Sequence, residues 1–457
     1  MSMILTDASV SQVFRSNRGP HRSGISDHIL VQCDEERQYL LPHAVSQLNL
    51  KWDKTPYRIS PDTLLTLQSH RVYSQVSFTY NGHNSCPDLI RVRDNGVDII
   101  AISVSYHPIK DVVTRLGLTR FLCEQLGYLI VSTQAFCINP TFCRDSNLGN
   151  FFKPVIVSSK TTQIARTLSH YINTSPSTCI ASKPSLACDT SADIFQLTKL
   201  PYKKKLSYFK SGIKTFHDIL SSLPDLTKPQ QKQCHVEITQ TPFVDLPILQ
   251  AFLSKLSPTI QFFDIEACQF PYPILYTTKP FEVFPFLFSV HYLNQDSHKT
   301  SHSLQFYDPD MDFRRQFAES LIHSLDPSQS IIVFDTTLER SICRYFSDIF
   351  PDLSDIFSLI LDQFVDISSL FFNHHVLLPG MQGKYSIKHI IKAINTATPY
   401  LDLSIQSGFF ASHAYKQLVY DPHCNHHQIK QSIIDYASTD THALLLVYHY
   451  LLKLVEN

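Results

Sequence analysis

The sequence predicts a mixed α/β protein with more than one domain. The chain has 457 residues, which is enough for two or three domains at roughly 150 residues each. Stretches of strand-like alternation are followed by stretches of helical periodicity in both the first and the last third of the chain. An apolar share of 43% is typical of a globular protein, so each domain has enough apolar residues for a core.

Composition narrows the classes of function. The net charge is −1, so any nucleic-acid partner must be held by a local patch. No window approaches the ~20 apolar residues of a membrane span, and the start of the chain lacks the pattern of a signal peptide. We therefore expect a cytoplasmic protein with no membrane partner. The eleven cysteines include no CxxC pair, which indicates free thiols. Glycine is scarce, which argues against Gly-rich phosphate loops.

The first third predicts strands and one helix. Residues 73–106 alternate between apolar and polar and include the turn DNGVD, so we expect strands joined by short turns. Residues 111–127 carry apolar side chains at helical spacing and end on Gly127, a plausible C-cap. Residues 128–136 return to a strand. Residues 172–192 are rich in Ser, Thr and Pro and predict a loop or linker.

A lysine cluster follows that loop, in two short amphipathic helical stretches around Gly212. It is interpreted either as a solvated helix face or as a phosphate contact. The cluster contains Lys203, Lys204, Lys205, Lys210 and Lys214.

The last third begins near Thr259 and again mixes strands and helices. Three strands forming a meander come first, then a helix, then a buried strand that turns into a helix with Thr336 or Thr337 as its N-cap. A long C-terminal helix closes the chain. The expected strands are 259–267, 281–293 and 301–309; the expected helix is 312–325, the strand–helix unit 330–350 and the final helix 426–454.

Two carboxylates stand inside the first of these strands, in the stretch QFFDIEACQFP. Asp264 and Glu266 are two residues apart, so both point to the same face of a strand. Like charges in apolar surroundings resist ionisation. A divalent cation between them would offset this cost, whereas the alternative is an edge strand whose acids face water.

The final helix carries a second pair of polar residues. Tyr436 and Asp440 are four apart and lie on one face of an otherwise apolar helix. By itself YxxxD is a weak signal, because an Asp that stabilises its local surface is common. An acid just after a later strand, Asp335 or Glu339, extends the pattern.

The order DxE, later acid, YxxxD resembles the DEDDy exonucleases, which have an RNase H-like fold. The stretches FFDIEA, PFLFSVHYL, IIVFDTTLER, FVDISSLF, GKYSIKHIIKAI, YLDLSIQSGFFA and IIDYASTDTHALL are similar to those of a bacterial family of uncharacterised two-domain proteins. That family joins a RecB-like PD-(D/E)XK nuclease module to a DEDDy exonuclease module. The resemblance covers about residues 255–455 well and 20–230 more faintly.

The resemblance implies a site for two Mg²⁺ or Mn²⁺ ions, which prefer carboxylate oxygens. Asp264 would bridge both ions, Glu266 would bind one, and Asp440 would complete the site. Tyr436 would orient the attacking water. Glu339 is the expected third acid, and Asp335 is the alternative ligand or a substitute for the usual Asn.

Several other polar residues are weighed against structural roles. Asp366 is interpreted as a helix cap. Lys388 is either a phosphate contact or a solvated lysine. Four histidines of the last third are interpreted as surface residues rather than metal ligands; they are His374, His375, His426 and His427.

The front module resembles the PD-(D/E)XK core but lacks its catalytic residues. Asp88 fits the first acid, yet Ala101 and Ser103 stand at the two catalytic positions of ExK. The glutamine of the next helix is replaced near Thr119 or Arg120. Cys33 matches the first ligand of an iron–sulfur cluster seen in some relatives. Only Cys179 and Cys188 remain of the other three, so no cluster is expected.

The sequence therefore predicts three regions. Residues 20–170 would form a degenerate restriction-endonuclease-like, RecB-like domain, 171–254 a linker and helical connector, and 255–457 an RNase H-like exonuclease domain. The expected function is a metal-dependent hydrolase, a 3′–5′ exonuclease acting on DNA or RNA ends. The alternative is a catalytically decayed scaffold that binds nucleic acid or protein, and the sequence names no protein partner.

Overall fold

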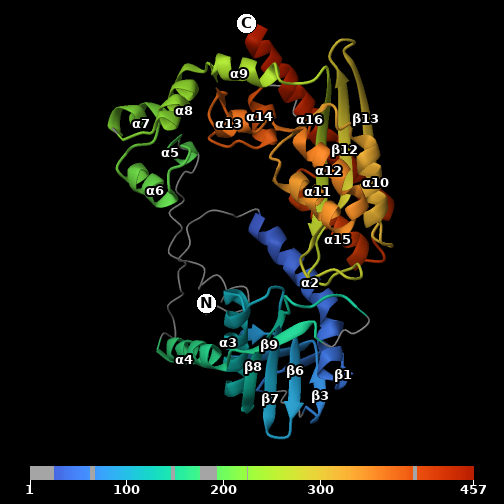
Figure 1. Cartoon of the computed structure of the whole chain (residues 1–457). Helices are drawn as coiled ribbons and strands as arrows, with labels where there is room; N and C mark the ends of the chain where they lie inside the picture. Colours follow the sequence, from blue (N-terminus) through green and yellow to red (C-terminus); the bar gives the residue numbers. More distant parts are fainter. Residues whose placement is uncertain are drawn as a thin grey trace. The chain divides into compact units, whose positions relative to one another are not determined.

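The computed structural model describes residues 25–61, 67–145, 150–174, 193–223, 225–394 and 399–456. The chain divides into two compact units. The first unit contains Met1–Cys188 and Gln269–Glu282, and the second contains Asp189–Cys268 and Val283–Asn457. The elements of each unit are labelled in Figure 1.

The first unit is built on a six-stranded mixed sheet. β6 and β7 form an antiparallel hairpin, and β7 runs parallel to β8. The alternation of β7 explains its packing, because successive side chains point to opposite faces. Ile99 and Ala101 share a core with helix α3, whereas Ile100 and Ile102 share one with α2. The sheet order is β1-β3-β6-β7-β8-β9.

The bounds of this unit agree with the mixed α/β expectation. The sheet strands are β1 (Lys51–Asp53), β3 (Arg71–Tyr73), β6 (Leu89–Arg93), β7 (Gly96–Ser103), β8 (Ile130–Ile138) and β9 (Phe152–Ile156). A smaller sheet contains β2 (Tyr57–Ile59), β4 (Val76–Tyr80) and β5 (His83–Ser85). The helices are α2 (Ile25–Leu48), α3 (Lys110–Gln125) and α4 (Ser158–Thr174).

The second unit holds a five-stranded mixed sheet in the order β13-β12-β11-β14-β15. β12 and β13 pair antiparallel, as the expected meander requires, and β14 is parallel to both β11 and β15. The four residues of β14 are all buried, which is typical of a parallel strand covered on both faces. The strands are β11 (Thr259–Gln269), β12 (Val283–Asn294), β13 (Lys299–Phe306), β14 (Ser330–Val333) and β15 (Phe364–Asp366).

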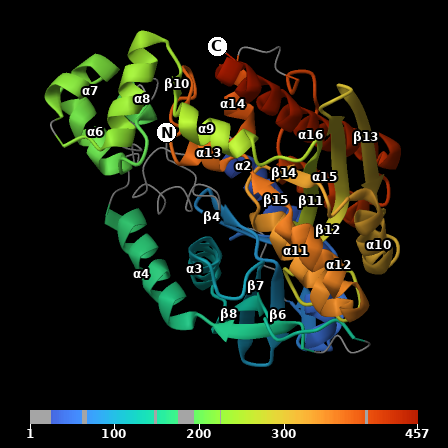
Figure 2. The same cartoon turned by 45° about the horizontal axis from the view of Figure 1, so that its top comes forward.

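Helices connect and cover these strands (Figure 2). α11 and α12 lie in the connection from β14 to the parallel strand β15 and contact each other, and the long α16 contacts β12. The helices are α10 (Arg314–Ser324), α11 (Thr337–Ile349), α12 (Ser354–Asp362), α13 (Ser369–Phe372), α14 (Ile387–Ala393), α15 (Gly408–Tyr420) and α16 (His426–Glu456), with the 3-10 turn η1 (Pro351–Leu353).

Residues 193–239 form a small helical module with a core of its own. Buried Ile194, Leu197, Phe216, Ile219 and Cys234 make this core. The region was expected to be a connector, and the structure groups it with the second unit. Its helices are α5 (Asp193–Gln196), α6 (Tyr202–Lys210), α7 (Phe216–Ser222) and α8 (Lys228–Thr239); β10 (Phe243–Val244), which pairs with β16 (Val376–Leu377), and α9 (Leu246–Leu253) follow.

Local expectations can be compared with the described residues. Gly127 follows α3 with a positive φ of 82°, the conformation expected after a helix end. Thr336 occupies the N-cap of α11 without a side-chain cap bond. Residues 172–174 of the expected loop 172–192 belong to helix α4 instead, and the remainder lies outside the described residues. Within the described parts of the chain, no helix is both long and apolar enough to cross a membrane.

Candidate metal-binding site

Strand β11 places Asp264 and Glu266 on one face. Phe262 shares that face by the same alternation, and its ring lies 5.6 Å from the ring of Tyr448 in α16. Phe263, on the other face, lies 6.0 Å from Phe364. The face that carries the acids is therefore the face on which α16 packs.

Helix α16 is fixed to the sheet directly beside Asp440. The Thr441 hydroxyl is fully buried and lies 2.8 Å from both Ser289 Oγ and His291 Nδ1 of β12. Further along the helix, the Tyr448 hydroxyl donates to Gln295 Oε1 at 2.9 Å. These contacts set the rotation of α16, so that Asp440 turns toward β11.

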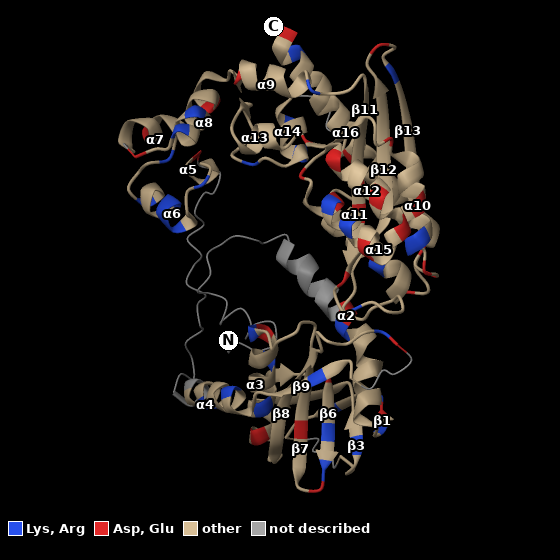
Figure 3. Cartoon of the chain, in the orientation of Figure 1, with Lys and Arg blue, Asp and Glu red and all other residues tan. Residues whose placement is uncertain are grey.

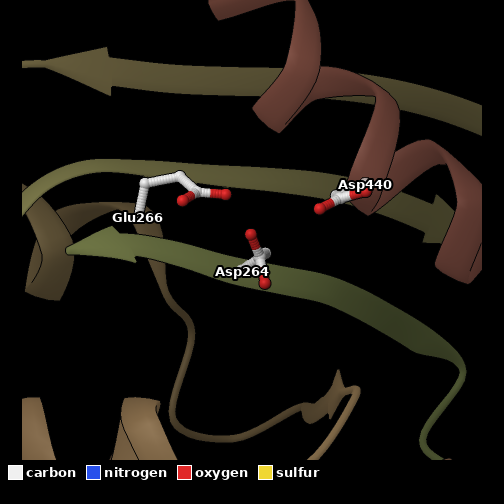
Figure 4. A group of neighbouring side chains, drawn as sticks. All are labelled: Asp264, Glu266 and Asp440. Carbon is white, nitrogen blue, oxygen red and sulfur yellow. The ribbon is translucent and has the colours of Figure 1, made fainter. Parts of the chain in front are cut away.

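The three carboxylates converge. One oxygen each from Asp264, Glu266 and Asp440 lies within 4.8 Å of the others, and Figure 4 shows the side chains pointing toward one another from β11 and α16. Glu266 is buried, and the two aspartates are half-buried. The Tyr400 hydroxyl donates a hydrogen bond of 2.6 Å to Asp440 Oδ1, which orients that carboxylate.

Burial and mutual repulsion oppose ionisation of these acids. Burial, followed by the charges of Glu266, Asp440 and Glu339, raises the pKa of Asp264 well above its usual range. Burial and the Asp440 carboxylate raise the pKa of Glu266 to about 8. Burial also raises the pKa of Asp440. A divalent cation among the three would remove this penalty, because an opposite charge favours the ionised form.

Glu339 is not one of the three converging acids, but its charge contributes to the raised pKa of Asp264, whereas Asp335 holds the turn before α11. Glu339 is 3% exposed in the first turn of α11, and its Oε2 is buried without a hydrogen-bond partner. Burial raises its pKa to about 8. Asp335 is exposed, has a φ of 66° and accepts bonds from the amide and hydroxyl of Thr337. Glu339 is therefore the better candidate for the fourth acid.

Lys388 supplies a positive charge beside the acids. Its Nζ donates to the Gln406 carbonyl oxygen at 2.6 Å and to the Tyr436 hydroxyl at 3.0 Å. The same atom lies 4.6 Å from the centroid of the Tyr436 ring. Burial lowers the pKa of Lys388, while the charges of Asp440, Glu266 and Asp264 oppose that shift. Lys388 is thus neither fully solvated nor remote from the site.

The Tyr436 side chain joins Lys388 to the acids. It is 3% exposed, and burial and the nearby Asp440 and Glu266 carboxylates raise its pKa. Its hydroxyl accepts from the Lys388 ammonium, not from a backbone amide. A purely space-filling tyrosine would not need this arrangement.

Sequence reasoning missed two further residues at the site. Tyr400 was not singled out, although it lies in the quoted stretch YLDLSIQSGFFA. Gly408 begins α15 so close to the acids that a Cβ there would lie 3.4 Å from Glu266 Oε2. Neither residue could be predicted from its spacing to the acids in the sequence, because each approaches them only in the folded protein.

The remaining candidates lie in structural positions. Asp366 ends β15, and its Oδ1 accepts from the amide and hydroxyl of Ser368 and from the amide of Asp335. It therefore braces the turn before α13, whose N-cap is Ser368 and not the expected Asp366. His374 corrects the expectation of a surface histidine: it is 3% exposed, and its Nε2 is bonded to the Tyr385 hydroxyl at 3.0 Å. His375 is half-buried, while His426 and His427 are exposed.

In the first unit, Asp88 is held by arginines. Its carboxylate oxygens accept from Arg115 at 2.8 and 3.2 Å and from the amide of Ile102 at 2.7 Å. Arg37 Nε lies 2.9 Å from Oδ1. Both Asp88 oxygens are engaged by cations of the chain itself, so the carboxylate has no oxygen free of a partner.

The other residues at the expected PD-(D/E)XK positions of the first unit also make contacts within that unit. Ala101 and Ser103 are fully buried, and the Ser103 hydroxyl donates to the His107 carbonyl at 3.2 Å. Thr119 bonds Ser85 at 2.7 Å, while Arg120 pairs with Glu124 on the same helix. The Cys33 side chain, Cys179 and Cys188 lie outside the described residues.

One family model matches part of the second unit. Residues 261–386 match the family described as Domain of unknown function (DUF2779), which fits the expectation of an uncharacterised domain family. The matched range includes Asp264, Glu266 and Glu339 but ends before Lys388, Tyr436 and Asp440. No curated protein and no solved structure matches the chain.

Asp88→Asn should destabilise the first unit. The change removes the charge that balances Arg115 and leaves that buried guanidinium without its counter-ion, which typically costs about 3–5 kcal/mol. Urea unfolding measures the loss. Asp94→Asn is the control, since Asp94 is an exposed acid paired with exposed His70; equal stability of the two variants would contradict this view of Asp88.

The metal-free protein should lose stability as pH rises from about 5 to 8. Folding raises the pKa of Glu266 from 4.5 to about 8, so the ionised form is disfavoured in the folded state and its cost grows as pH approaches that value. Binding of Mn²⁺ reverses this effect and releases protons. Calorimetric titration at pH 7 in two buffers of different ionisation enthalpy measures the release, and identical heats in both buffers would contradict the assignment.

Proposed function

We propose that this protein is a Mg²⁺- or Mn²⁺-dependent nuclease that hydrolyses phosphodiester bonds at the ends of DNA or RNA. One observation carries the proposal: carboxylates from residues 264, 266 and 440, brought together from a strand and a distant helix, converge within 4.8 Å. Repulsion of this kind lowers stability unless a cation occupies the group. A binding or catalytic role accounts for acids in such a position.

The residues fit a hard divalent ion. Every candidate ligand is a carboxylate oxygen, which suits Mg²⁺ and Mn²⁺ better than it suits softer metals. Glu339 Oε2 is buried without a hydrogen-bond partner and the Glu339 charge acts on Asp264, which makes Glu339 a further candidate ligand. When bound, a pair of such ions supplies Lewis acidity and stabilises charge on the attacking and leaving oxygens. The ions would be held by Asp264, Glu266, Glu339 and Asp440.

The chain's own residues position the water. The Tyr436 hydroxyl accepts a hydrogen bond from Lys388. Its proton can then be donated to Asp440, and its second lone pair can accept a hydrogen bond from a water. Tyr436 thereby orients the attacking water toward the phosphorus. The Lys388 charge beside the acids also attracts the phosphodiester. Tyr400 holds the Asp440 oxygen through its 2.6 Å bond, which fixes the carboxylate before substrate arrives.

The DEDDy, RNase H-like assignment and the 3′–5′ polarity follow from the sequence resemblance. The order of elements around the five-stranded sheet supports the DEDDy, RNase H-like assignment: the first strand of the sheet carries two acids, a helix after its fourth strand carries another, and the last helix carries Tyr436 and Asp440. The family match covers three of these acids.

The RecB-like front unit serves as a scaffold in this proposal. The pairing of Asp88 with Arg115 and Arg37 favours that role, because the acid that would hold a metal is already neutralised. If the second unit also lacks turnover, the whole protein is a binding scaffold, and the variants below decide between the two.

Asp440→Asn should abolish metal-dependent degradation of 5′-labelled single strands. Loss of one charged ligand should reduce turnover by about 100-fold or more, within the range of metal and acid–base contributions. Asp435→Asn is the matched control on the same helix, since Asp435 is exposed and bonds Gln431. Wild-type protein that binds strands yet cuts none with Mg²⁺ or Mn²⁺ would instead establish the scaffold.

Tyr436→Phe should keep the fold and lose turnover. The ring remains, so the free energy of unfolding should change by only the ~1 kcal/mol of a lost hydrogen bond. Turnover should fall tenfold or more, roughly the low end of an acid–base contribution, while metal affinity is retained. Single-turnover assays at saturating Mn²⁺ measure this effect, and normal turnover would make the phenol structural.

Lys388→Met should behave like Tyr436→Phe in turnover but differ in metal binding. Removing a cation near the acids should maintain or tighten Mn²⁺ affinity, because like charges repel. In the Tyr436→Phe background the lysine change should add little. Lys392→Met, an exposed lysine of the same helix, is the control; additive losses in the double variant would show that Lys388 acts independently of Tyr436.

A further inference from the structure

The helical module of residues 193–239 carries a concentration of positive charge. It contains eight lysines, four acidic residues and no arginine, in a chain whose overall charge is −1. Lysines colour α6 blue in Figure 3. Repulsion among these lysines destabilises a module whose core is small. An anionic partner would relieve that repulsion.

Four of these lysines are available to a ligand. Each is exposed, and none makes an ion pair among the described residues. Lys205 differs, because its Nζ donates to the Phe195 carbonyl oxygen at 2.8 Å. We call these four exposed lysines of α6 and the turn after it the lysine face; they are Lys203, Lys204, Lys210 and Lys214.

Three of the four acids of the module accept hydrogen bonds from backbone amides. These hydrogen bonds orient the three carboxylates at helix ends and at a loop contact, and among the described residues none of the three forms an ion pair with a lysine of the module. Asp193 accepts from Phe216 at 2.9 Å, Asp218 from Lys214 at 3.1 Å and from Thr215 at 2.9 Å, and Glu237 from Gly380 at 3.0 Å. The lysine face is therefore not balanced by salt bridges within the module.

The spacing of the lysines suits a phosphate backbone. Lys203 and Lys210 are seven residues apart and share one face of α6, about 10 Å apart along the axis. That length matches roughly three phosphates at ~3.4 Å per nucleotide of one strand. Lysines bind phosphates as point charges, whereas arginine supplies most specific contacts to base edges. The face therefore suits sequence-independent contact.

The module is seated on the segment that leads to the site. Glu237 bonds the amide of Gly380, and a Cβ at Gly383 would collide with the Gln196 carbonyl oxygen. Four residues later α14 begins at Ile387, and its second residue is Lys388, whose charge acts on the acids. The module and the acid group thus share one connected piece of structure.

We propose that the lysine face binds the phosphate backbone of single-stranded nucleic acid, outside the acid group. The inference rests on the proposed function in one respect, namely that the bound strand is the substrate. The face would hold the strand while the acid group acts on its end.

The test compares two charge-reversal variants of the full chain. Lys203→Glu/Lys210→Glu alters the face, and Lys255→Glu/Lys299→Glu makes the same charge change at exposed lysines of the second unit outside the module. Fluorescence anisotropy with labelled 20-nucleotide DNA and RNA single strands, and with a duplex, is recorded in EDTA so that no cleavage occurs. Circular dichroism confirms that both variants fold.

The first variant should bind both single strands about tenfold more weakly at low salt. Its slope of log affinity against log salt should flatten by about 1.4, since two phosphate contacts of ~0.7 each are lost. The control should match wild type. Equal binding by the two variants would overturn the proposal, and so would an effect confined to the duplex. Because EDTA prevents catalysis, this experiment tests strand binding by the lysine face independently of the proposed nuclease activity.

Discussion

Repulsion among three converging carboxylates is the constraint on which the second unit depends. Asp264, Glu266 and Asp440 approach within 4.8 Å in surroundings that raise the pKa of each acid. The sheet and α16 must hold them together against this force. The buried Thr441, bonded to Ser289 and His291 of β12, does so at the residue next to Asp440.

A single lysine only partly offsets that repulsion. Lys388 is held by the Gln406 carbonyl and by Tyr436, so its ammonium lies near the acids without taking the place of a ligand. When ionised, the three carboxylates and that of Glu339 carry more negative charge than one ammonium can balance, so the group keeps a net negative charge. Divalent ions would supply the missing charge, and the same lysine would then hold Tyr436 in place. The arrangement links charge balance to the position of the phenol.

Much of this site was predictable because its residues follow local periodicities. The two-residue spacing of Asp264 and Glu266 on a strand, and the four-residue spacing of Tyr436 and Asp440 on a helix, place each pair on one face. The choice between Asp335 and Glu339 needed the structure. A φ of 66° at Asp335 turns that residue toward the start of α11, while Glu339 is buried one turn later.

Other features could not be predicted, because they depend on contacts between distant segments. The bond from Tyr400 to Asp440 joins residues 40 apart, and no local pattern signals it. His374 was expected at the surface, but its partner Tyr385 belongs to a loop that folds back over it. The helical module has strong helix signals, yet its place in the second unit is set by Glu237 and Gly383.

Diffraction from crystals grown with Mn²⁺, recorded at the manganese absorption edge, tests the central claim most directly. The account predicts anomalous density among the carboxylate oxygens of Asp264, Glu266 and Asp440, with Glu339 turned toward it, and loss of that density in Asp264→Asn. Wild-type crystals with no anomalous density at these carboxylates, despite millimolar Mn²⁺, would contradict it.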